Sequence, residues 1–187
     1  MRDSGITRQR ILAAAADLFY GDGIRGTSLD AIAARAKVTK RTLYYHFRSK
    51  DDLIAAYLEA ADEPTLVRYA AWVDATDGSL ATQIAAVFDK LGRAAAKKQW
   101  KGCGFLRAAA EFAATPGHPA LKVGSRHKQR FEAWLTTRIT AAGLDRPALR
   151  ARQLMVLLDG AVTELLLHRD GDYAEAAALA AAQILKP

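Results

Sequence analysis

Cysteine and histidine are scarce in this chain, and their scarcity excludes several kinds of site. Cys103 is the one cysteine among 187 residues, so neither an intramolecular disulfide nor a metal site built on several thiolates can form. The histidines lie far apart without the short spacings of metal ligands, at His46, His118, His127 and His168. We therefore expect no metal and no cofactor.

Long apolar runs are also missing. Residues 1–5 lack the apolar segment of an export signal, and the most apolar windows further on are interrupted by Asp17, Glu164 and Glu175. The sequence thus predicts a cytoplasmic protein that has no membrane partner.

Strand patterns and catalytic motifs are absent as well. No run alternates between apolar and polar residues, and helical periodicity continues along the chain, which predicts an all-α fold. There is no glycine-rich phosphate loop and no Ser/His/Asp or Cys/His set that the sequence brings together. We predict that the protein is not an enzyme; an all-α enzyme is kept as the alternative of another class.

The chain does have a concentrated positive charge at its N-terminal end. Residues 1–50 carry ten Lys and Arg against four Asp and Glu, whereas residues 51–187 carry 17 against 16. A local basic excess favours a polyanionic partner, because binding to phosphates releases condensed counterions. A solvated basic face with no such partner explains the charge equally well.

Three short helices are predicted in the same region. Apolar residues at i, i+4, i+7 and i+8 indicate a helix over residues 7–20, and Ser28 stands where the cap of a second, short helix is expected. A tight turn at 36–38 leads to Thr39, which caps a third helix with Leu43 and Phe47 on its inner face. This order is typical of a DNA-binding helix-turn-helix, whose reading helix would cover about residues 39–47.

The segment Thr42-Leu43-Tyr44-Tyr45-His46-Phe47 belongs to a longer set of matching positions over about residues 6–66. The set includes Thr7-Arg8-Gln9-Arg10-Ile11-Leu12, Leu18-Phe19, Gly23, Thr27-Ser28-Leu29, Ile32-Ala33, Val38 and Lys50-Asp52-Leu53. These residues resemble the TetR family of transcriptional regulators. The resemblance implies an N-terminal three-helix DNA-binding domain at 6–66, and a helical ligand-binding and dimerisation domain at 67–187.

Residue types indicate which side chains meet DNA. Arg41, in the first turn of the reading helix, is the predicted leading base reader, because its guanidinium can donate two bonds to guanine. Hydroxyls, ammonium groups and helix N-termini suit phosphates. The predicted DNA contacts are Thr27, Ser28, Lys37, Thr39, Lys40, Arg41, Thr42, Tyr44, Tyr45, His46 and Lys50.

The C-terminal part suggests a self-association surface and a ligand pocket. The helix at 147–168 is apolar around much of its circumference and the last helix is rich in alanine, which favours a homodimer or, alternatively, a helix buried within one subunit. The predicted interface residues are Met155, Val162, Leu166, Ala174, Ala177, Ala178 and Ala181. The predicted pocket residues are Trp72, Phe88, Leu91, Trp100, Cys103, Phe105, Phe112, His127, Phe131, Trp134 and Met155.

These features together predict a sequence-specific DNA-binding regulator. We expect a homodimeric repressor on double-stranded, palindromic operator DNA, released by a small-molecule effector of unknown identity. The alternatives are an architectural DNA-binding protein without an effector, an activator, and a regulator that responds to a partner protein. Cys103 is expected to be a small buried thiol, with a redox-responsive thiol as the alternative.

Overall fold

Two units make up the chain, and each combines segments that lie apart in sequence. The computed structural model describes residues 2–187, with side chains from Ser4 onward, so Met1 lies outside the described residues. The first unit contains the residues up to Asp62 together with Gly104–Gly124. The second contains Glu63–Cys103 and Ser125–Pro187.

This division differs from the predicted domain boundaries of 6–66 and 67–187. The first break falls after Asp62, close to the predicted one, but Gly104–Gly124 clusters with the N-terminal helices and not with the rest of the C-terminal part. The difference arises because this segment contacts residues more than 80 positions earlier, and no local sequence pattern indicates such contacts.

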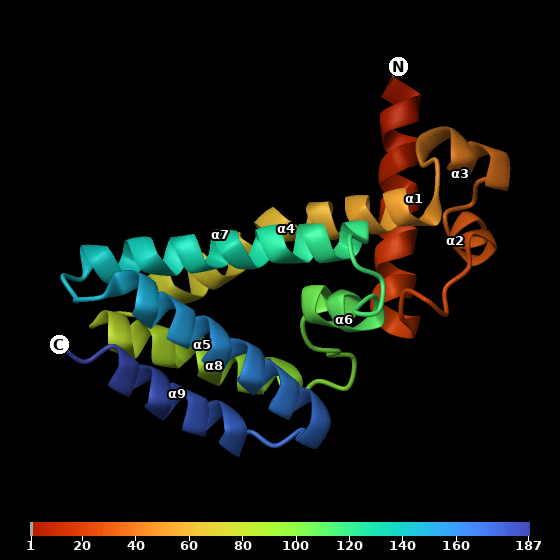
Figure 1. Ribbon diagram of the computed structural model, residues 1–187. Helices are drawn as coiled ribbons and strands as arrows, with labels where there is room; N and C mark the ends of the chain where they lie inside the picture. The colour runs from red at the N-terminus through yellow and green to blue at the C-terminus, as the bar shows by residue number, and fades with distance from the viewer. Residues whose placement is uncertain (1) are drawn as a thin grey trace. The chain divides into compact units, whose positions relative to one another are not determined.

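Helices account for all the regular structure of the described residues, as predicted. In the first unit, α1 spans Arg2–Asp22, α2 Leu29–Arg35, α3 Lys40–His46 and α6 Gly104–Glu111 (Figure 1). The helices α4, Lys50–Asp74, and α7, Pro119–Ala141, begin in this unit. The unit packs around fully buried apolar side chains, among them Ile11, Phe19, Ile32, Leu43 and Leu53.

The turns of the first unit are fixed by caps. Ser28 and Thr39 cap α2 and α3, and their hydroxyls accept the backbone N–H groups of Ala31 and Thr42. Lys37, between the two helices, has a positive φ of 53°. Arg10 of α1 donates to the carbonyls of Ala36 and Lys37, which fixes this left-handed turn against α1.

In the second unit, α5, Leu80–Ala95, and α8, Pro147–His168, pack with α9, Asp172–Ile184 (Figure 1). The alanines of α9 allow close packing: a Cβ atom added at Gly92 of α5 would lie 2.9 Å from the Cβ of Ala174. Two of the small residues on α9, Ala177 and Ala181, are buried. Among the described residues, no helix is both long enough and apolar enough to cross a membrane.

Candidate nucleic-acid interface

The reading helix α3 has one buried and one open face. Leu43 and, just after the helix, Phe47 are buried and anchor it to the first unit. Tyr44 and Tyr45 are 45% and 80% exposed. Large aromatic side chains are usually at least partly buried. Two adjacent exposed tyrosines on a basic helix therefore indicate a contact surface for a partner.

The two cations in the first turn of α3 differ in their surroundings. The Nζ atom of Lys40 lies 3.0 Å from Oδ1 of Asp30, and the hydrogen bond to Asp30 raises the pKa of Lys40. Arg41 is exposed and takes part in none of the hydrogen bonds, ion pairs or ring contacts found among the described residues. Its guanidinium is therefore available to an external acceptor.

Other predicted contacts are divided between exposed and internal positions. The caps Ser28 and Thr39 are exposed, as is Lys37 in the turn. The Thr42 hydroxyl lies 2.8 Å from that of Thr39, and the rings of His46 and Tyr45 meet edge-on at 5.2 Å. These side chains lie at the start of α2 and along α3, so the structure brings them onto consecutive elements of one unit.

Thr27 does not fit its predicted role as a phosphate contact. It is buried, and its hydroxyl donates to the Gly23 carbonyl at 2.7 Å, so it fastens the turn between α1 and α2 from inside. Lys50 is also engaged: its ammonium group donates to the Arg25 carbonyl at 3.3 Å. Burial lowers the pKa of Lys50, against the opposing effect of the nearby Glu111 and Asp51 carboxylates.

Glu111, the last residue of α6, belongs to this unit although no sequence pattern predicted it. Its two carboxylate oxygens accept the backbone N–H groups of Ile24 at 3.1 Å and Arg25 at 2.7 Å. The Arg25 side chain returns a bond from Nε to the Glu111 carbonyl at 2.8 Å. We call this set of contacts the Glu111 latch; it connects α6 to the turn that leads into α2.

Comparison with known proteins agrees with this geometry. Residues 11–57 match the family model described as bacterial regulatory proteins, tetR family. The structure of SCO4454, a TetR-family transcriptional regulator from Streptomyces coelicolor, is 33% identical, covers 96% of this chain and 94% of its own, and superposes with a TM-score of 0.79. The chain belongs to the TetR family. A TetR-type regulator from Streptomyces avermitilis is 31% identical over 94% of this chain and 97% of its own, also with a TM-score of 0.79.

The curated relatives match this chain over very different lengths. The regulator YjdC of Escherichia coli is 24% identical over 87% of this chain and 84% of its own. SrpR and TtgW of Pseudomonas putida are 40% identical over only 58 residues, and the match spans 27% and 43% of their lengths. The predicted family, the all-α fold and the non-enzymatic regulatory class are confirmed by these comparisons.

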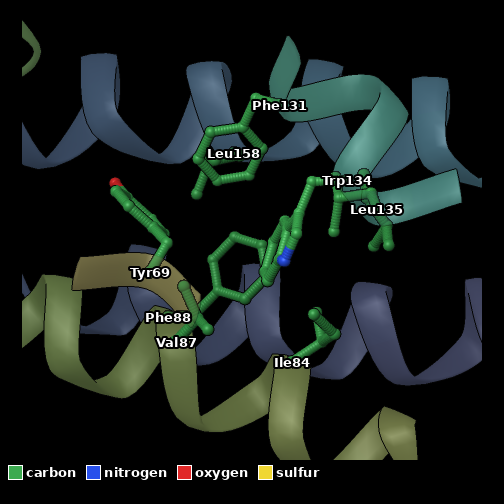
Figure 2. Close-up of a pocket in the computed structure, with 9 residues that line it drawn as sticks. Tyr69, Ile84, Val87, Phe88, Phe131, Trp134, Leu135 and Leu158 are labelled. Carbon is green, nitrogen blue, oxygen red and sulfur yellow. The ribbon is translucent and has the colours of Figure 1, made fainter. Parts of the chain in front are cut away.

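The second unit of this TetR-family chain contains an apolar chamber. It is lined by side chains of α4, α5, α7 and α8, namely Tyr69, Ile84, Val87, Phe88, Phe131, Trp134, Leu135, Leu154 and Leu158. Figure 2 shows the Phe131 ring above Phe88, with the Tyr69 hydroxyl pointing away from Phe88 and Trp134. The space left at the centre is about 20 Å³, enough for a single water molecule.

Only three of the predicted pocket residues, Phe88, Phe131 and Trp134, line this chamber. Phe105 and Phe112 belong to the first unit, and Trp100 lies beneath the Arg169 guanidinium. The others that do not line it are Trp72, Leu91, Cys103, His127 and Met155. Seven of the eleven predicted residues are buried, and the other four, Trp72, Trp100, Cys103 and Trp134, are half-buried. Apolar periodicity does not tell a chamber wall from ordinary core.

The predicted dimer residues are mostly internal to one subunit. Met155, Val162, Ala174, Ala177 and Ala181 are buried without any partner chain, because α5, α8 and α9 pack on one another. Leu166 and Ala178 are half-buried, and Leu166 lies against Gly102. Most of these positions thus pack within the subunit, and their part in a dimer stays a prediction. The large apolar side chains that α8 and α9 leave exposed are Leu149, Val156, Leu167 and Leu179.

Proposed function

We propose that this chain is a transcriptional repressor that binds a palindromic operator as a homodimer and releases it when a small effector enters the chamber. The exposed face of α3 is the observation that supports this proposal most directly. It presents an unengaged Arg41 beside Tyr44 and Tyr45, on a helix held rigidly by buried residues at its other face. A helix of this kind fits the major groove of DNA, where arginine distinguishes guanine from the other bases.

Dimerisation follows from the small size of the reading helix. Seven residues, Lys40–His46, give too little contact area for useful specificity alone. Two subunits placing α3 in successive major grooves, about 34–36 Å apart, read twice as many base pairs. Leu149, Val156, Leu167 and Leu179 supply an exposed apolar face on α8 and α9 that a second subunit would cover.

The DNA interaction is tested by fluorescence anisotropy with the chain's own upstream intergenic DNA and a scrambled control, across a salt series. We expect affinity for the intergenic DNA to fall steeply with salt, because several phosphates are neutralised. Tyr45→Phe should weaken binding by roughly threefold to tenfold through loss of one phosphate hydrogen bond, with the salt slope unchanged because no charge is lost. Equal affinity for both DNAs at every salt concentration would contradict a sequence-specific regulator.

The chemistry of the chamber restricts the effector to uncharged molecules. Among the residues that the structure describes, no Asp, Glu, Lys or Arg lines it, and the nearby carboxylate of Asp159 is paired with Lys128. Burial raises the pKa of Tyr69 well above its usual value, so this phenol stays neutral. An ion entering this environment would lose its hydration without gaining a counter-charge.

The chamber also favours an aromatic effector that inserts between the aromatic side chains lining it. The Phe131 ring meets Tyr69 at 4.9 Å and Trp134 at 5.3 Å, both in near-perpendicular contacts that a flat ligand can replace. Because only about 20 Å³ is open, a ligand of several carbon atoms must displace side chains. Tyr69 lies on α4, the helix that starts directly after the reading helix, so displacement there would act on the DNA-binding unit.

This effector class is tested with 2-naphthalenemethanol and its anionic analogue 2-naphthoate. We expect the alcohol to quench tryptophan fluorescence and to lower operator affinity, and the carboxylate to bind at least about tenfold more weakly because of its desolvation cost. Val87→Phe fills the chamber and should abolish alcohol binding, whereas Val67→Phe, on the exposed side of α4, should not. Stronger binding of the carboxylate would contradict the uncharged class.

A further inference from the structure

We propose that Glu111 is a positioning residue for DNA binding: through the latch it holds the α1–α2 turn in the conformation that presents α2 and α3 to DNA. This inference rests on the proposed DNA-binding function. It implies that α6, which lies outside the segment 11–57 matched by the family model, contributes to DNA binding.

The geometry of the latch is that of an anion held by consecutive backbone amides. Both oxygens of one carboxylate accept N–H groups of adjacent residues, Ile24 and Arg25, and bonds of this charge-assisted type are stronger than neutral ones. Gly23, just before them, has a φ of +88°, a conformation that L side chains rarely adopt. The turn therefore has an unusual backbone path that an external group stabilises.

The latched turn leads directly into the elements that meet DNA. The Thr27 hydroxyl bonds back to Gly23, and Ser28, the next residue, caps α2. Lys50, at the start of α4, donates to the Arg25 carbonyl. The turn is thus tied to α6 by its amides and to α4 by a carbonyl, so its position defines where α2 begins.

Further contacts keep α6 itself in place beside α1 (Figure 1). Arg107 donates to the Tyr20 carbonyl at 2.7 Å, near the C-terminal end of α1. The Phe112 ring is stacked on His118 at 3.7 Å, and the Arg25 guanidinium lies 5.3 Å from the centre of that phenyl ring. Nε2 of His118 lies 3.3 Å from Oδ1 of Asp51, without hydrogen-bond alignment. Displacing α6 would therefore withdraw Glu111 from the turn.

The direction in which one substitution changes DNA affinity distinguishes this role from a simple effect of charge. Glu111→Gln removes a negative charge from a DNA-binding unit, which by charge alone would strengthen binding to phosphates. The latch predicts the opposite, because an amide offers one acceptor oxygen where two N–H groups need acceptors. Asp22→Asn is the matched control: it removes one charge from the same turn region, and the Asp22 carboxylate is exposed and outside the latch.

The experiment measures amide hydrogen exchange and operator binding of the full-length variants. For Glu111→Gln we expect exchange at Ile24 and Arg25 to accelerate about tenfold or more, with the rest of α1 unchanged, and operator affinity to fall about tenfold. Asp22→Asn should bind as tightly as the wild type or more tightly.

Different results would contradict the proposed function and the positioning role of Glu111. A wild-type chain that binds no operator would overturn the proposed function, whatever the exchange data. Wild-type binding that Glu111→Gln leaves unchanged or strengthens would overturn the positioning role alone. Faster exchange spread over the whole first unit would overturn it too, because it would indicate a general loss of stability.

Discussion

Replacing Val156 with glutamate is expected to turn the homodimer into monomers and to weaken operator binding by about 100-fold or more. Val156 is 71% exposed on α8, so the substitution leaves the subunit's own packing intact. In a dimer it would place two carboxylates, one from each subunit, inside an apolar contact. Burying unpaired charges costs several kcal/mol, about the scale of a modest interface energy.

The exposed apolar residues around Val156 lie along one side of the helix. Leu149, Val156 and Leu167 recur at spacings of seven and eleven, which places them on one side of α8. Gly160 lies on the same side, and a Cβ atom added there would meet nothing within 4 Å. Leu179 contributes an exposed apolar side chain from α9.

The measurement is sedimentation velocity combined with operator titration. The control is Val67→Glu, which makes the same chemical change at a 56% exposed valine that belongs to α4 and not to α8 or α9. We expect the control to sediment and bind as the wild type does. A Val156→Glu variant that remained dimeric with full affinity would show that another surface joins the subunits.

The local elements of the DNA-binding unit were predictable because their signals are local. Ser28 and Thr39 are N-caps where the sequence placed them, and Leu43 and Phe47 are buried as their helical spacing indicated. The same hydroxyl chemistry misled the assignment of Thr27. A threonine beside a turn suits a phosphate and a backbone carbonyl equally well, and only burial distinguishes the two.

Contacts distant in sequence were not predictable. Glu111 lies 86 residues from Arg25, so no periodicity or spacing relates the two. On α8, apolar residues around much of the circumference suggested a dimer face, but packing within the subunit buries most of them, and the exposed Val156 was not among the predicted interface residues. The chamber was missed in part because Tyr69 and Leu154 satisfy the helical pattern of ordinary core residues.

Arg41→Ala is expected to remove most of the sequence specificity of the regulator. A bidentate arginine–guanine contact contributes about 1–3 kcal/mol of discrimination, and a homodimer loses it in both half-sites, so operator affinity should fall by about 100-fold or more. Binding to scrambled DNA should fall much less, because non-specific binding depends on phosphates. The ratio of the two affinities, measured by anisotropy at fixed salt, is therefore the informative quantity.

Lys40→Ala provides the matched comparison, since it removes a neighbouring cation from the same helical turn. Lys40 is already paired with Asp30. The pairing partly neutralises the positive charge of Lys40 and holds its ammonium group at the start of α2. We expect this variant to weaken binding to the operator and to scrambled DNA by similar factors of a few-fold, so that the ratio of the two affinities stays the same. If Arg41→Ala behaved in the same way as Lys40→Ala, Arg41 would be a phosphate contact, and base reading would have to come from Tyr44, Tyr45 or the α2 N-terminus.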